Sequence, residues 1–224
     1  MTVLHLADDG EAADLAAFLS RLLHYDRAAA VRLQAAGTAL AVFGRPPSFE
    51  VLTIRTVRLA KPYENGLDVN LDVTVSAGEL LESVDESAAT AVVPAAVTGP
   101  PWAGVLPPRG GWRPEPGLPA PDALRALVAA AVAEFRSRTG ELVPERRTRA
   151  ELDRIGRDIW SRTVAGTRLP VRAVHAAQSL GFLRRRGAVE AGLFSSGAWL
   201  RLRTPYGSVA VRQAGLGALN VSVR

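Results

Sequence analysis

The sequence predicts an α+β protein with an N-terminal antiparallel sheet, packed helices and a C-terminal winged-helix-like module. Three observations indicate this class. Apolar and polar residues alternate strictly over residues 67–76, which is typical of a half-buried strand in an antiparallel sheet. Prolines are concentrated between residues 94 and 121, which divides the chain into two parts. Over residues 148–212, two amphipathic helix patterns are followed by a hairpin signal.

Residues 1–93 form the first predicted unit, an acidic α+β sheet domain. Asp8 and Glu11 have the spacing of a capping box, in which two side chains satisfy unpaired amides at a helix start. In the strand at 67–76, the residues expected to face the core are Leu67, Val69, Leu71, Val73 and Val75. In chain order we expect a helix over 10–24, a hairpin over 31–43, strands over 49–59 and 67–76, and a short helix over 77–84.

Residues 94–121 form a predicted connector rich in proline and tryptophan, with nine of the 15 prolines. Proline-rich segments act as semi-rigid spacers between domains. Trp102 and Trp112 argue against a fully solvated spacer, because each would leave a large apolar ring in water. We therefore expect the connector to lie across one of the domains with both rings at least partly buried; an arm that binds a partner is the alternative.

Residues 122–224 form the predicted basic winged-helix-like domain. A helix of about 16 residues begins at Pro121, which suits the first helical position. Thr148 and Glu151 form a second capping box, and another helix follows Pro170. Residues 199–204 and 208–212 then form a hairpin, while residues 216–223 alternate weakly and are expected to add an edge strand. Helices followed by a two-stranded wing are the outline of a winged-helix domain.

Charge is distributed unevenly along the chain. Residues 1–112 hold 8 basic and 13 acidic side chains, whereas residues 113–224 hold 19 basic and 9 acidic ones. The net charges of −5 and +10 add up to the overall +5. A genome rich in G and C replaces Lys by Arg throughout a protein, so it does not explain this asymmetry. The second half is therefore expected to meet an acidic or anionic partner.

Several functional classes are disfavoured by the sequence. It has no cysteine, which excludes disulfides and thiolate metal sites. No apolar run has the roughly 20 residues needed to span a bilayer, and the N-terminus lacks the pattern of a signal peptide, so we expect a cytoplasmic protein without a membrane partner. Asp68, Asp72 and Glu79 have calcium-loop spacing, but Val73 occupies the position that requires glycine. We expect no metal, no cofactor and no catalytic residue.

Four segments resemble a family of uncharacterised actinobacterial proteins: residues 22–33, 71–81, 100–112 and 196–209. The resemblance covers most of the chain. It implies a high-GC Gram-positive origin and a cytoplasmic setting, and it brings no activity, substrate or site residue.

The predicted function is binding of double-stranded DNA by the C-terminal module, because its basic residues fall on expected surfaces. The helix after Pro170 presents Arg172, His175, Gln178 and Ser179 on one face, and Arg, Gln and Ser are types that read base edges in a major groove. On the hairpin, arginines alternate with leucines and so share one face. A solvated arginine face, with Trp199 shielded by guanidinium stacking, explains the same pattern. The predicted nucleic-acid-binding residues are Arg172, His175, Gln178, Arg184, Arg185, Arg186, Arg201, Arg203 and Arg212.

Two alternatives belong to other classes. The protein could be an interaction or assembly factor whose basic face binds an acidic protein partner, including the acidic first half of another copy. The N-terminal sheet domain is expected to mediate self-association or contact with a protein partner in either case. A small enzyme with an unrecognised site is the third reading, and a pocket lined by His24, Asp26 and arginines would favour it.

Overall fold

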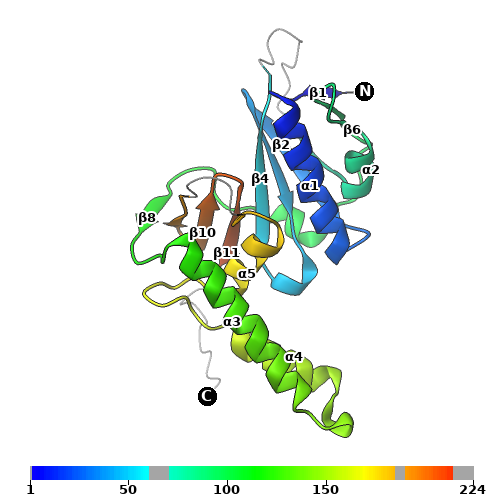
Figure 1. Ribbon diagram of the computed structural model, residues 1–224. Coiled ribbons are helices and arrows are strands. Elements are labelled where there is room, and N and C mark those ends of the chain that lie inside the picture. The colour runs from blue at the N-terminus through cyan, green and yellow to red at the C-terminus, as the bar shows by residue number, and fades with distance from the viewer. Residues whose placement is uncertain (1, 61–70, 185–189, 214–224) are drawn as a thin grey trace, which may run out of the picture.

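The computed structural model describes residues 2–60, 71–184 and 190–213. These residues form helices and antiparallel sheets, which confirms the predicted α+β class (Figure 1). As predicted, Asp8 accepts a hydrogen bond from the Glu11 amide where the first helix begins. The elements of the first half are β1 (Val3–His5), α1 (Asp9–Tyr25), β2 (Ala30–Ala36), β3 (Ala39–Gly44), the 3-10 turn η1 (Pro47–Phe49), β4 (Leu52–Arg58), β5 (Asp72–Ser76), α2 (Ala77–Glu82), β6 (Val84–Asp85) and β7 (Thr90–Val92).

The second half begins after the short 3-10 turn η3 (Pro101–Gly104). Thr148 accepts a hydrogen bond from the Glu151 amide and caps its second long helix, as the capping box predicts. The elements of this half are β8 (Arg113–Glu115), α3 (Pro121–Gly140), η4 (Pro144–Arg146), α4 (Arg149–Trp160), α5 (Val171–Ser179), β9 (Gly192–Ser196), β10 (Trp199–Thr204) and β11 (Gly207–Arg212).

One eight-stranded antiparallel sheet runs through both halves, in the order β5-β2-β3-β4-β11-β10-β9-β8. The first half contributes β2 to β5 and the second half β8 to β11, and β4 and β11 pair at the centre. A smaller sheet, β1-β7-β6, lies beside the first half. The second half differs by the helical hairpin α3–α4, which precedes α5 and extends away from the sheet (Figure 1).

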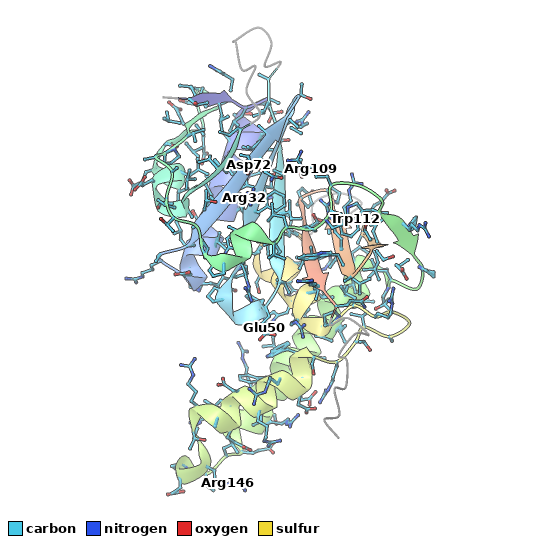
Figure 2. The ribbon with its side chains drawn as sticks, turned by 180° about the vertical axis from the view of Figure 1, so that it is seen from behind. Arg32, Glu50, Asp72, Arg109, Trp112 and Arg146 are labelled. Carbon is cyan, nitrogen blue, oxygen red and sulfur yellow. The ribbon has the colours of Figure 1, made fainter. Side chains whose placement is uncertain are left out.

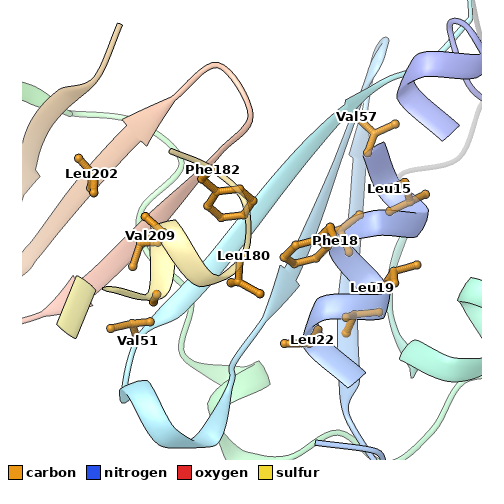
Figure 3. Close-up of a cluster of buried hydrophobic side chains, with 14 of the residues drawn as sticks. Leu15, Phe18, Leu19, Leu22, Val51, Val57, Leu180, Phe182, Leu202 and Val209 are labelled. Carbon is orange, nitrogen blue, oxygen red and sulfur yellow. The ribbon is translucent and has the colours of Figure 1, made fainter. Parts of the chain in front are cut away.

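The main core lies between the sheet and helices α1 and α5. Leu15, Phe18 and Leu22 of α1 are buried against the strands, and the buried face of α5 joins the same cluster. Phe18 stacks on Phe182, which follows α5, with ring centroids 5.9 Å apart (Figure 3). The two halves therefore share one core. None of the helices in the described ranges combines the length and apolar character required to cross a bilayer.

The prediction of a wing is wrong: the two strands form where expected, but they do not form the projecting hairpin of a winged-helix domain. A wing projects from its domain, whereas β10 pairs with β9 and β11 pairs with β4, so the hairpin lies inside the large sheet. Helix α5, the helix predicted to read base edges, packs one face against the core and buries Val171, Ala173, Val174, Ala176 and Ala177. Long-range strand pairing explains the difference, because a hairpin signal in the sequence does not show which strands will flank it.

The connector, residues 94–121, crosses the outer face of the sheet, the face opposite α1 and α5 (Figure 2). Trp102 packs with Phe43, Leu52 and Ile54, and both Trp102 and Trp112 are half-buried. Arg32 of β2 donates a hydrogen bond to the Ala103 carbonyl and forms an ion pair with Asp72, at 2.7 Å. The expectation that both tryptophan rings are at least partly buried is therefore confirmed.

Strand β5 matches the second half of the predicted strand at 67–76. Val75 is fully buried, while Leu71 and Val73 are partly buried and pack against the same core. Leu67 and Val69 lie outside the described residues, as does the predicted edge strand at 216–223.

Candidate functional site: an arginine-lined cleft between the two halves of the sheet

A cleft opens where the two halves of the sheet diverge. β4 and β11 pair at three positions only, from Leu52 with Ala210 to Ile54 with Ser208. Beyond Ile54, β4 continues beside β3, while the chain of the second half turns between Thr204 and Gly207. The cleft has a volume of about 900 Å³ and is lined by β4, the strands β9 to β11, and Arg109 and Trp112 of the connector. Two carboxylates, Glu11 of α1 and Glu190 before β9, also line it. Arg109 and Trp112 are labelled in Figure 2.

Arg55 of β4 links the two sides of the cleft. Its guanidinium lies 2.9 Å from Glu11 and 3.2 Å from Asp14, both on α1, and donates a 2.8 Å hydrogen bond to the Tyr206 carbonyl in the opposite turn. Only 6% of the side chain is exposed. Arg184 lies 2.6 Å from Asp14 and stacks on the Tyr206 ring, and its hydrogen bond to Asp14 raises the pKa of Arg184. The positive charges on this side of the cleft are therefore paired.

Arg201 and Arg203 of β10 bring unpaired positive charge to the outer side of the cleft. The Nε of Arg201 donates a 2.9 Å hydrogen bond to the Ser208 hydroxyl, and its guanidinium carbon lies 5.6 Å from the centroid of the Trp112 ring. Burial, followed by the neighbouring Arg203, lowers the pKa of Arg201. In the part of the chain that the structure describes, neither arginine forms an ion pair. An anion in the cleft would supply the missing partner.

The residues predicted to contact DNA lie in different places. His175 of α5 is enclosed by Trp160 and Phe49, with ring centroids 4.5 and 5.0 Å away, and burial lowers its pKa. On the same helix Gln178 is exposed and Arg172 is half-buried. Arg184 pairs with Asp14, whereas Arg201, Arg203 and Arg212 share the outer face of the sheet, as their alternation predicts. Arg185 and Arg186 lie outside the described residues.

Other members of the cleft were not selected from the sequence as site residues. Arg55, Arg109 and Trp112 reach it from β4 and the connector, which are distant in sequence from β10. The connector's Arg109-Gly-Gly-Trp112 run is the one local signal, because a large ring and a cation stand beside flexible glycines. Among the described residues, no three His, Cys, Asp or Glu side chains form a group that could hold a metal ion.

The sequence matches two families of unknown function. Residues 1–104 match the family described as "Domain of unknown function (DUF8010)", and residues 107–216 match "Domain of unknown function (DUF8185)". The resemblance to an uncharacterised family is thereby confirmed, whereas the actinobacterial origin stays a prediction. No curated protein matches the sequence.

The fold is similar to that of two crystal structures of the DNA polymerase sliding clamp from Pseudomonas aeruginosa, one with a ligand. Both have a TM-score of 0.50; they share 12% and 13% sequence identity with this chain and cover 95% of it. The chain spans 65% and 64% of the length of the clamp chains. This similarity shows the fold alone. It overturns the predicted function, DNA binding by a C-terminal winged-helix module, because these residues belong to a clamp-like fold in which one face of α5 packs against the core.

Proposed function

We propose that this protein is an interaction factor whose cleft binds an acidic segment of a protein partner. The chain matches two families of unknown function and has a clamp-like fold. The observation that carries this proposal is the pair Arg201 and Arg203, which line the cleft without an ion-pair partner among the described residues. Arg203 is exposed, whereas Arg201 is half-buried and burial lowers its pKa. A buried cation costs free energy unless it is paired, so a carboxylate that enters the cleft would give Arg201 a favourable partner.

The arrangement around Arg201 favours a carboxylate side chain. Ser208 accepts a hydrogen bond from the Nε of Arg201, and among the described residues no hydrogen bond is found for the two terminal nitrogens of this cleft-lining guanidinium. Two parallel N–H groups of a guanidinium match the two oxygens of a carboxylate. The fold similarity supports the same class of function, since the two structures are named as clamps of a DNA polymerase, which is itself a protein. Self-association through the N-terminal half stays a proposal.

The test measures binding of a fluorescein-labelled oligoglutamate peptide by fluorescence anisotropy at low ionic strength. We expect the dissociation constant to rise about tenfold in Arg201→Ala and in Arg203→Ala, because each removes a charge that faces the cleft. Arg212→Ala is the matched control: Arg212 is exposed on the same sheet face but does not line the cleft. The proposal fails if the wild-type protein does not bind the peptide, or if the control weakens binding equally.

A further inference from the structure

We infer that the acidic segment binds as an added β-strand on the open edge of β4, at residues 55–58. This inference rests on the proposed function and adds the binding mode. On one side, these residues pair with β3, from Val42 with Arg55 to Ala39 with Arg58. On the other side, the pairing with β11 ends at Ile54. Within the described ranges, no strand occupies that side of residues 55–57. At the end of this stretch the Arg58 carbonyl accepts a hydrogen bond from the Ala7 amide at 2.9 Å, Leu59 bridges Leu6, and the Arg58 side chain pairs with Glu11 of α1 at 2.8 Å.

An unpaired strand edge in a cleft is a template for another strand. Alternate residues of an antiparallel strand direct their N–H and C=O groups to opposite sides, so the edge of β4 presents backbone groups to the cleft. The addition of an extended peptide to such an edge is a recurring mode of protein recognition, in which main-chain hydrogen bonds supply affinity. The cleft runs along Arg55, Thr56 and Arg58 and has room for a segment of chain.

The second half of the protein holds the edge open. In the turn that faces β4, Thr204 donates a 3.0 Å hydrogen bond to the Gly207 carbonyl, and Tyr206 accepts the bond from Arg55. Gly207 has a φ of 152°, and a side chain there would overlap the ring of Phe182. Because these contacts fix the turn against the core, β11 cannot shift to extend its pairing along β4. In the described part of the chain, the position beside residues 55–57 of β4 is therefore left open by this turn.

Charge and strand geometry together specify the pattern of the bound segment. Side chains of an added strand alternate between the two faces of the sheet. Arg55 faces α1 and already has its carboxylates, whereas Arg201 and Arg203 lie on the outer face without them. Only the outward residues of the segment therefore meet unpaired cations. The preferred segment has acidic residues at every second position.

The experiment compares two peptides of identical composition. In one, glutamate and threonine alternate; in the other, the glutamates form one block. We expect the alternating peptide to bind about tenfold more tightly, because all its carboxylates reach one face. Two N-methylated versions of the alternating peptide then test the backbone contacts, one with the glutamate amides methylated and one with the threonine amides methylated. One version should lose about tenfold or more in affinity and the other should keep it, since alternate amides face β4.

The outcomes separate this inference from the proposed function. If the alternating peptide and both methylated peptides bind equally and all depend on Arg201, strand addition is overturned and the cleft still binds acidic segments. If no acidic peptide shows a dependence on Arg201, both proposals are overturned. A tenfold contrast between the two methylated versions, lost in Arg201→Ala but retained in Arg212→Ala, supports strand addition.

Discussion

At the scale of single residues, Arg55 and Arg201 differ in their partners: Arg55 is paired with carboxylates, whereas Arg201 contacts uncharged groups. Arg55 is compensated by Glu11 and Asp14 and bonded to Tyr206, so it connects the first half of the protein to the second. Arg201 is also largely removed from water, but the Ser208 hydroxyl and the Trp112 ring carry no charge. Removing Arg55 would take one ion-pair partner from Glu11 and from Asp14, which also pair with Arg58 and Arg184, respectively, whereas Arg201 has no ion pair among the described residues. Under the proposed function, the first is structural and the second binds the ligand.

His175 provides a pH-dependent test of the packing around α5. Burial between Trp160 and Phe49 lowers the pKa of His175 below its ordinary value of 6.5. Below pH 6.5 the unfolded chain therefore binds more protons than the folded one, so this residue makes the folded state less stable as the pH falls. We expect His175→Phe, which keeps an aromatic ring at this position, to remove that contribution.

The measurement is urea denaturation of the wild-type protein and His175→Phe at neutral and mildly acidic pH. Carboxylates titrate in both proteins, so the difference between their unfolding free energies isolates the histidine. That difference should shift in favour of His175→Phe as the pH decreases. A difference that stays constant with pH would contradict the buried environment of His175.

At the scale of elements, local sequence patterns predicted where helices and strands form, but not which elements pack beside one another. The capping residues Asp8 and Thr148 begin helices where expected, and the alternation in β10 places Arg201 and Arg203 on one face as predicted. What covers that face was not predictable, because Trp112 reaches it through a connector with no local signal for its destination. The cleft was missed for the same reason: its geometry depends on where the pairing of β4 with β11 ends.

The connector gives a prediction at this scale. Trp102 packs on the outer face of the sheet against Phe43, Leu52 and Ile54. Trp102→Ala should lower the unfolding free energy by about 2–3 kcal/mol, somewhat less than for a fully buried ring, because part of the lost surface is already exposed. Val105→Ala is the control within the same segment, since Val105 is 48% exposed and should change stability by less than about 0.5 kcal/mol. Urea denaturation measures both, and equal effects would contradict a docked connector.

At the scale of the whole molecule, the two halves are joined at the centre of the sheet and in the core. β4 of the first half pairs with β11 of the second, and Phe18 stacks on Phe182 above that junction. The two family matches divide the chain at residues 104 and 107, close to the boundary between the two sets of strands. The division into a sheet domain (1–93), a connector (94–121) and a basic domain (122–224) stays a prediction. Whether those units are independent depends on how they unfold.

Phe182→Ala tests this point, because Phe182 belongs to the second half and stacks on α1 of the first. The ring is 2% exposed, so its removal should cost about 3–5 kcal/mol. If the halves unfold as one unit, the slowest-exchanging amides of α1 and of β10 must lose the same free energy of protection, since both exchange through global unfolding. Native-state hydrogen exchange measures the two elements separately, and Phe182→Leu, which keeps most of the apolar volume, should shift both by a smaller common amount. Protection that falls in β10 and persists in α1 would show that the halves unfold independently, as the predicted domain boundaries imply.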